Sequence, residues 1–299
     1  MAVSINEIVS GRKSFFIAPD TSRFPENFLE EYFALGYECY FIQNDKHLSI
    51  DKKIDIITSV FKDCILFFNI DAPIPDVVWP NYIQNLQNQY NNSVLIGIMY
   101  TKRQSKEEKS RIERKYLLEI GISCGAVQLE YQKGTNFVII QNLLFANQAQ
   151  GRRKTIRAVC NKSCTFTFGL DSNQYSGVLQ DISLSHFSFI YPKFKLKIQL
   201  YEKITEIHFN ICGFMFRSDA ILIMEREVKD GILLVFSFVS QTGNNGLDDR
   251  LRQLLTPSLY QLMSANTNAL LNQLFSKAGM MQEARTSIEY GEISGLDEI

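Results

Sequence analysis

The feature that most constrains the fold is a repeated change of period in the hydrophobic pattern of the first half of the chain. Short apolar runs indicate β-strands, and segments with apolar residues three and four positions apart indicate α-helices. The runs that predict strands are KSFFIAP, YECYFIQ, CILFFNI, SVLIGIMY and GAVQLEY, and each is followed by a segment of helical spacing. Five strand–helix pairs in succession predict a parallel sheet with helices on its faces.

A unit of this size and order is flavodoxin-like, and ligands of such sheets bind at the carboxyl ends of the strands. The polar residues expected there are Asp20, Asp71, Thr101 and Lys133. They resemble the site of response-regulator receiver domains, in which carboxylates hold Mg²⁺ and accept a phosphoryl group. The acidic pair of receivers is replaced here by APD, and Asp71 lies two residues beyond its strand. We therefore expect a receiver-like scaffold over residues 1–148 that is not phosphorylated, with a phosphorelay role of Asp71 as a disfavoured alternative.

The second half carries short β-type runs without intervening helices. These runs are CTFTF, YSGVLQDIS, HFSFIY, KLKIQLY, TEIHFNICGFMF, AILIMERE and GILLVFSFV. The pattern predicts an antiparallel barrel or sandwich. After it, residues 247–278 have helical spacing, and Pro257 is expected to open a second helix. We assign residues 149–278 to a β-barrel domain with C-terminal helices, whose apolar faces pack on the barrel or form a dimer or partner surface. The acidic segment 279–299 is expected to be disordered.

The charge of the chain is balanced overall and concentrated locally. With 31 Lys and Arg against 32 Asp and Glu, the net charge is −1, so no global field attracts DNA, RNA or an anionic membrane. Yet the stretch GRRKTIRAVC, at the boundary between the two predicted domains, places Arg152, Arg153, Lys154 and Arg157 within six positions. Either these cations lie in a solvated linker past a helix end, where they offset the helix dipole, or they form a local anion site.

Two motifs in this region resemble those of the PilZ domains, receptors for the bacterial second messenger cyclic di-GMP. The first is Arg153-x-x-x-Arg157, preceded by Arg152, and the second, 24 residues later, is Asp181-x-Ser183-x-x-His186, in which histidine stands where the family has glycine. Receiver-like domains joined to PilZ domains form a recognised subgroup. The resemblance implies a PilZ-like barrel, cyclic di-GMP as ligand, and a binding site made of these six residues.

The residue types suit that ligand. Guanidinium groups bind phosphate oxygens with two parallel hydrogen bonds and also read the O6 and N7 atoms of guanine. The resemblance assigns a clamping role to Arg153 and Arg157, with Arg152 assisting, and a reading role to Asp181 and Ser183. His186 is expected to stack on a purine or, when protonated, to pair with phosphate. A second hypothesis is a degenerate adaptor that acts through protein contacts without nucleotide, and His186 is the residue that favours it.

Other classes of function find little support in the sequence. The spacing Cys160-x-x-x-Cys164 has no matching second pair for a metal site, and two buried thiols are the expectation. No nucleophile elbow or H-E-x-x-H pattern is present, so we expect neither an enzyme nor a cofactor. The six scattered cysteines and the absence of a signal peptide or a long apolar segment predict a cytoplasmic protein without membrane insertion. The expected partners are cyclic di-GMP and an unidentified protein, with the motility apparatus as one candidate.

Overall fold

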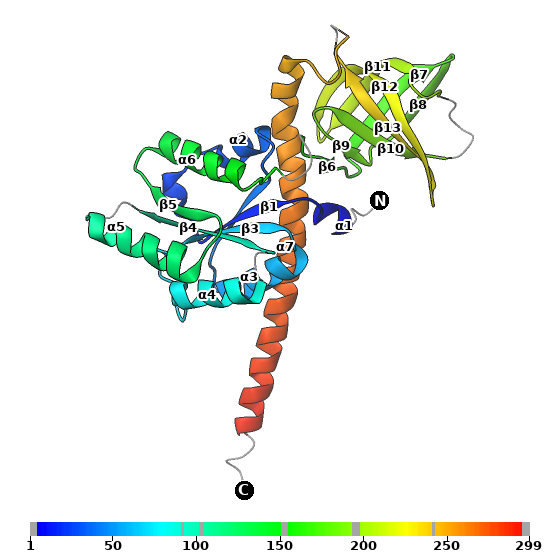
Figure 1. The fold of residues 1–299 in the computed structure, drawn as a ribbon. Helices are drawn as coiled ribbons and strands as arrows, with labels where there is room; N and C mark the ends of the chain where they lie inside the picture. Colours follow the sequence, from blue (N-terminus) through cyan, green and yellow to red (C-terminus); the bar gives the residue numbers. More distant parts are fainter. Residues whose placement is uncertain are drawn as a thin grey trace. The chain divides into compact units, whose positions relative to one another are not determined.

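The computed structural model describes residues 5–90, 93–101, 105–150, 155–192, 198–240 and 243–294 (Figure 1). The chain divides into two compact units. The β unit comprises residues 152–267 together with residues 1–8 and 30–36, and the α/β unit comprises residues 9–29, 37–151 and 268–299. Each unit is described by itself below. The domain bounds predicted from the sequence stay predictions.

The α/β unit is built on a five-stranded parallel sheet with the order β2-β1-β3-β4-β5, which is the flavodoxin order (Figure 1). This confirms the predicted fold class. The central strand β3 explains the strength of the sequence pattern, because all six of its side chains are buried, as expected for a parallel strand covered on both faces. The strands are β1 (Lys13–Ile17), β2 (Cys39–Ile42), β3 (Cys64–Asn69), β4 (Leu95–Thr101) and β5 (Gly125–Leu129).

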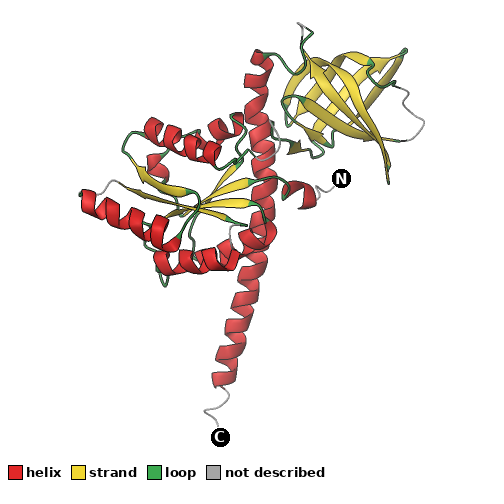
Figure 2. Ribbon diagram, in the orientation of Figure 1, coloured by secondary structure: helices red, strands yellow, loops and turns green. Residues whose placement is uncertain are grey.

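Helices cover both faces of this sheet (Figure 2). Phe28 of α2 contacts Phe137 of α6 on one face, with the ring centroids 6.2 Å apart. On the other face, the hydroxyl groups of Thr58 in α3 and Tyr90 in α4 lie 2.8 Å apart. The helical segments between residues 5 and 146 are α1 (Ile5–Ile8), η1 (Thr21–Arg23), α2 (Phe28–Ala34), α3 (Ile50–Val60), α4 (Trp79–Tyr90), α5 (Lys106–Glu113), the π-helical η2 (Arg114–Ile120) and α6 (Lys133–Ala146).

The β unit contains an eight-stranded antiparallel sheet with the order β6-β9-β10-β13-β12-β11-β7-β8, and it curls into the predicted barrel-like form (Figure 2). Its strands are β6 (Ala158–Val159), β7 (Cys164–Leu170), β8 (Asn173–Val178), β9 (Asp181–Ile182), β10 (His186–Tyr191), β11 (Lys203–Ile211), β12 (Phe214–Val228) and β13 (Gly231–Val239).

One predicted strand of this unit is wrong. The run KLKIQLY extends over residues 195–201, of which 195–197 lie outside the described residues, and residues 198–201 form no strand. Tyr201 has a φ of 68°, a left-handed conformation that ends an extended segment. Its N–H donates to the carbonyl of Leu222, while the N–H of Gln199 donates to the Glu202 carboxylate. The segment is therefore a turn fastened to β12.

The core of the β unit is aromatic. Phe187 and Phe189 of β10 stack on Phe236 of β13, with centroid separations of 5.1 and 5.4 Å, and Phe166 of β7 lies 4.2 Å from Phe189. All four rings are buried. Because side chains alternate between the two faces of a strand, this fixes the opposite face of β10, where His186 and Ser188 lie, as the face outside the aromatic core.

A single helix, α7 (Asp249–Ser294), follows the barrel and contains Pro257 in its interior. The prediction that Pro257 opens a second helix is therefore wrong. Proline costs the backbone hydrogen bond to the carbonyl of Gln253, but Leu255 and Leu259 on its two sides are fully buried. Burial on both sides of the proline offsets the lost bond. The expectations of a disordered tail over residues 279–299 and of a dimer through these helices stay predictions.

None of the described helices combines the length and the apolar composition that crossing a lipid bilayer requires.

Candidate functional site

The second motif forms a tight β-hairpin between β9 and β10. Ser183 closes the turn, since its backbone N–H donates to the carbonyl of His186 at 2.7 Å and its hydroxyl accepts from the backbone N–H of His186 at 3.0 Å. Ser183 is only 1% exposed. The serine at this place of the motif therefore has a clear local task, which is to fix the hairpin that presents Asp181 and His186.

Backbone pairing brings the first motif against the second. Arg157 directly precedes β6, and β6 pairs with β9 so that Val159 lies opposite Asp181. The guanidinium Nη1 of Arg157 lies 3.8 Å from Oδ2 of Asp181. Their side chains remain 37% and 22% exposed, so the pair stays open to solvent and to a ligand. Arg152 and Arg153, the other predicted clamp residues, and Lys154 lie outside the described residues.

His186 lies beside this ion pair and is half-buried. Burial, and then the nearby Arg157 cation, lower the pKa of His186, while the Asp181 carboxylate acts in the opposite direction. The imidazole is therefore neutral at pH 7. Its Nδ1 atom lies 2.8 Å from the hydroxyl of Ser185, which in turn lies 3.1 Å from the hydroxyl of Thr155. These contacts place Thr155, from the segment between the two arginines of the first motif, at the same hairpin.

The backbone of His186 explains how histidine is accommodated where the family has glycine. His186 is the first residue of β10, and it is not one of the described residues that have a positive φ. Glycine is required where φ is positive or where a side chain has no room. The conformational reason for glycine is therefore absent here, and what remains is the volume of the imidazole at the face of the site.

Ser188 is a site residue that the sequence reasoning missed. It lies directly opposite Asp181 in the β9–β10 pairing, so the two side chains share one face of the sheet. The Ser188 side chain is 1% exposed, and within the described part of the chain its Oγ has no hydrogen-bond partner. Buried hydroxyl groups are nearly always bonded, so a water or ligand atom is the expected partner. The only hint in the sequence is a serine within the aromatic run HFSFIY.

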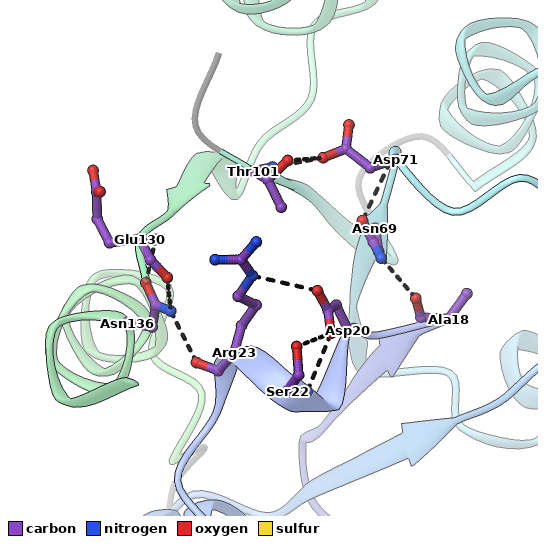
Figure 3. A network of polar contacts seen from close by, with 9 residues as sticks. All are labelled: Ala18, Asp20, Ser22, Arg23, Asn69, Asp71, Thr101, Glu130 and Asn136. Atoms are coloured by element: carbon purple, nitrogen blue, oxygen red, sulfur yellow. Dashed lines mark hydrogen bonds and ion pairs between the residues drawn. The ribbon is translucent and has the colours of Figure 1, made fainter. Parts of the chain in front are cut away.

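The carboxyl edge of the α/β sheet holds a second group of polar side chains (Figure 3). One carboxylate oxygen of Asp71 accepts from both the backbone N–H and the hydroxyl of Thr101, at 2.6 and 2.7 Å. Asn69, at the end of β3, accepts from the N–H of Asp71 and donates to the carbonyl of Ala18. The structure thus joins two predicted residues, Asp71 and Thr101, through Asn69 to the first strand.

Asp20 is engaged separately. The hydroxyl of Ser22 donates to it at 2.5 Å and the guanidinium Nε of Arg23 lies 3.4 Å away (Figure 3). The bond from Ser22 is the main cause that lowers the pKa of Asp20, and Arg23 adds to it. Lys133, the fourth predicted residue, is exposed at the first position of α6. Across the described ranges, His, Cys, Asp and Glu side chains do not gather in groups of three that could hold a metal ion.

Asn136 completes this edge and was not predicted. It is 0% exposed, accepts from the N–H of Glu130 at 2.7 Å and donates to the carbonyls of Glu130 and Arg23, both at 2.9 Å (Figure 3). These bonds connect the end of β5 to the turn after β1, so Asn136 fixes the position of the two segments at this edge of the sheet. The sequence contains no sign of it, because its partner Arg23 is 113 residues away.

Comparison with known proteins gives structural likeness only. No family model matches the chain, and no curated protein matches it. Among solved structures, the chain is similar to the PilZ domain of YcgR from Escherichia coli with c-di-GMP, at 20% identity and a TM-score of 0.33, over 40% of this chain and 97% of that one. This is the family that the two motifs resemble.

Two longer structures are similar over about half of their own length. One is YcgR from Escherichia coli in complex with c-di-GMP, at 22% identity and a TM-score of 0.32, over 40% of this chain and 51% of that one. The other is the inhibitor of motility MotI/DgrA from Bacillus subtilis, at 10% identity and a TM-score of 0.30, over 40% of this chain and 52% of that one. Likeness of this degree leaves function to be argued from the site itself.

Proposed function

We propose that this chain is a cyclic di-GMP-binding signalling effector and not an enzyme. One observation carries the proposal: the pairing of β6 with β9 brings Arg157 of the first motif within 3.8 Å of Asp181 of the second. Two sequence motifs that are separated by 24 residues thus meet on one face of the β unit, with His186 beside them. A cation, a carboxylate and a planar ring are the groups that a cyclic dinucleotide needs, because it presents phosphates, guanine N–H groups and flat bases.

The ion pair is suited to partner exchange. An exposed pair at this separation contributes at most about 1 kcal/mol, so it is readily broken. In the proposed complex the Arg157 guanidinium leaves Asp181 for a phosphate oxygen. The freed Asp181 carboxylate then accepts hydrogen bonds from the N–H edge of a guanine. Each group replaces a weak contact by a charge-assisted hydrogen bond.

The remaining site residues have matching roles. Arg152 and Arg153 precede Arg157 in the chain and supply the further cations that a dianionic ligand requires. Ser183 holds the hairpin, and His186 stacks on a purine. The ligand would engage the arginines of the first motif. Because a ligand shifts an equilibrium only between states that it binds differently, this engagement would be the event that changes domain orientation or partner binding.

The alternative is an adaptor that has lost nucleotide binding and acts through protein contacts in the cytoplasm. The imidazole of His186 favours it, since it adds volume where the family has glycine. The two proposals differ in one measurable property, the affinity for cyclic di-GMP.

Titration calorimetry of the full chain with cyclic di-GMP tests the proposal. We expect saturable binding by the wild type and its loss in the double variant Arg153→Ala and Arg157→Ala. Arg157→Lys should bind more weakly than the wild type, because lysine keeps the charge and loses the two parallel hydrogen bonds. Arg217→Ala is the matched control, since Arg217 is an exposed arginine of β12 that pairs with Glu206 at 3.3 Å, outside both motifs. No binding by the wild type would overturn the receptor proposal in favour of the adaptor.

A further inference from the structure

Three cysteines of the β unit gather at one place although the chain brings them from separate segments. Cys160 follows β6, Cys164 begins β7, and Cys212 lies in the turn between β11 and β12. The Sγ atoms of Cys164 and Cys212 are 3.8 Å apart. Cys160 and Cys164 are buried, whereas Cys212 is exposed. The group therefore combines a sheltered thiol with one that solutes can reach.

The backbone fixes this arrangement. Ile211 pairs with Cys164 across β11 and β7, and the N–H of the next residue, Cys212, donates to the carbonyl of Ser163 at 3.2 Å. Cys212 has a φ of 50°, an uncommon conformation for a residue with a side chain. The turn that it shares with Gly213 thus presents the Cys212 thiol directly over the start of β7.

We propose that Cys164 and Cys212 are an oxidisable dithiol that forms a disulfide when it meets a hydroperoxide. The sulfur separation of 3.8 Å exceeds the bond length of about 2.05 Å, so formation requires a small rotation of the two side chains. In a reducing compartment such pairs are transient and serve as redox sensors instead of structural bonds. This inference stands on the thiol geometry alone and does not depend on nucleotide binding.

The reaction balances with the hydroperoxide as the oxidant. The Cys164 thiolate attacks one oxygen of hydrogen peroxide, the O–O bond breaks, and one molecule of water leaves as Cys164 becomes a sulfenic acid. The Cys212 sulfur then attacks the Cys164 sulfur, the S–O bond breaks, a second water leaves, and the disulfide forms. Two thiols and one hydrogen peroxide give one disulfide and two waters.

The electrostatics of the group agree with this division of roles. The hydrogen bond from Cys160 lowers the pKa of Cys164 to about 6, whereas partial burial, followed by the charge of the neighbouring Cys164 thiolate, raises the pKa of Cys212 to about 11. Cys164 is therefore the thiolate that attacks the peroxide, and the exposed Cys212 is the resolving thiol. The thiols of Cys64 and Cys124 in the α/β unit differ, because burial raises the pKa of each to about 12, and such thiols are inert.

Peptide mapping after peroxide treatment tests the proposal, and the sequence allows a clean assignment. Trypsin cleaves after Arg157, Lys162, Lys193, Lys203 and Arg217, so the three cysteines fall on the separate peptides 158–162, 163–193 and 204–217. After hydrogen peroxide and alkylation, we expect peptide 163–193 to be linked to peptide 204–217. Free thiols in the unfolded protein should fall from six to four.

Cysteine variants distinguish a disulfide between Cys164 and Cys212 from one that involves Cys160. Cys212→Ser and Cys164→Ala should each lose the linked peptides, and Cys160→Ser should keep them; circular dichroism checks that each variant is folded. Because Cys64→Ala removes a buried thiol outside the group, it is the matched control and should behave as the wild type. A link between peptides 158–162 and 163–193, a disulfide between two copies of the chain, or six thiols left after treatment would each overturn the proposal.

Discussion

Arg157 and Asp181 face each other across the pairing of β6 and β9, with 3.8 Å between the guanidinium Nη1 and the carboxylate Oδ2. Each belongs to a different motif, and neither is buried enough for the pair to contribute much to stability. We therefore expect this ion pair to matter more for the affinity for a ligand than for the stability of the fold. This distinction can be measured, because a change in one residue should affect the two properties very differently.

Asp181→Asn should weaken cyclic di-GMP binding by about tenfold or more, because a charged acceptor becomes a neutral amide at a guanine N–H edge. The free energy of unfolding should change by less than about 1 kcal/mol, since the lost ion pair is partly exposed. Calorimetry and urea unfolding give the two quantities. Asp219→Asn is the matched control, because Asp219 pairs with Lys203 at 2.8 Å in the same unit, outside the motifs. Equal losses of affinity in both variants would contradict the assignment.

The pKa of His186 should lie below its ordinary value of 6.5, mainly because of burial and secondly because of Arg157. The imidazole C–H resonances measured between pH 5 and 8 give this pKa, and the spectrum of His186→Gln identifies the signal. Arg157→Ala should raise the pKa of His186 only part of the way toward 6.5, because the larger cause, burial of the ring, is unchanged. Between pH 6.5 and the lower folded-state pKa, His186 is protonated in the unfolded chain but still neutral in the folded chain. The free energy of unfolding should therefore decrease as the pH falls through that window. An unchanged pKa in Arg157→Ala would contradict the proximity of the two groups.

Binding of cyclic di-GMP should strengthen as the pH is lowered from 7.5 toward 5.5. The bound dianion favours the imidazolium form of His186, so a neutral histidine in the free protein gains a proton in the complex. Calorimetry at several pH values measures the trend. His186→Phe should keep the stacking surface and the affinity at neutral pH but lose the pH dependence. If His186→Phe follows the same pH trend as the wild type, another group is responsible.

The parallel sheet could be predicted because its strands leave a strong pattern. All of β3 is buried, and all of it except the terminal Asn69 is apolar; helical segments separate the strands. The turn at Tyr201 could not be predicted, because the hydrophobic alternation in KLKIQLY does not indicate that one residue has a left-handed φ. The helix through Pro257 shows a related limit, since local propensity predicts a break where burial of Leu255 and Leu259 maintains the helix.

For the candidate site, the motifs indicated which residues matter and left the geometry open. The two-residue strand β6 is too short to leave a periodic pattern, yet its register with β9 is what places Arg157 beside Asp181. Ser188 entered the site only through its position opposite Asp181. Both depend on the register in which strands pair, which composition and spacing do not encode.

The receiver-like edge should take up no phosphoryl group from acetyl phosphate and Mg²⁺. Thr101 donates two hydrogen bonds to one Asp71 oxygen, and Asp20 is paired with Arg23, so the carboxylates do not converge on a cation. Intact-mass measurement should show an unmodified protein, as it should for Asp71→Ala. A phosphoryl adduct on the wild type that is absent from Asp71→Ala would establish the disfavoured phosphorelay role.

Asn136→Ala should destabilise the α/β unit by about 3 kcal/mol, because it removes three hydrogen bonds and leaves the backbone groups of Glu130 and Arg23 without buried partners. Trp79 is the only tryptophan of the chain and is buried in α4, so its fluorescence reports unfolding of this unit. The urea midpoint should fall while the slope with denaturant stays constant. Asn142→Ala, an exposed position on the same helix α6, is the matched control and should leave the midpoint nearly unchanged. Equal midpoints for the two variants would mean that Asn136 does not hold the sheet edge, and the closed network drawn in Figure 3 would then need another source of stability.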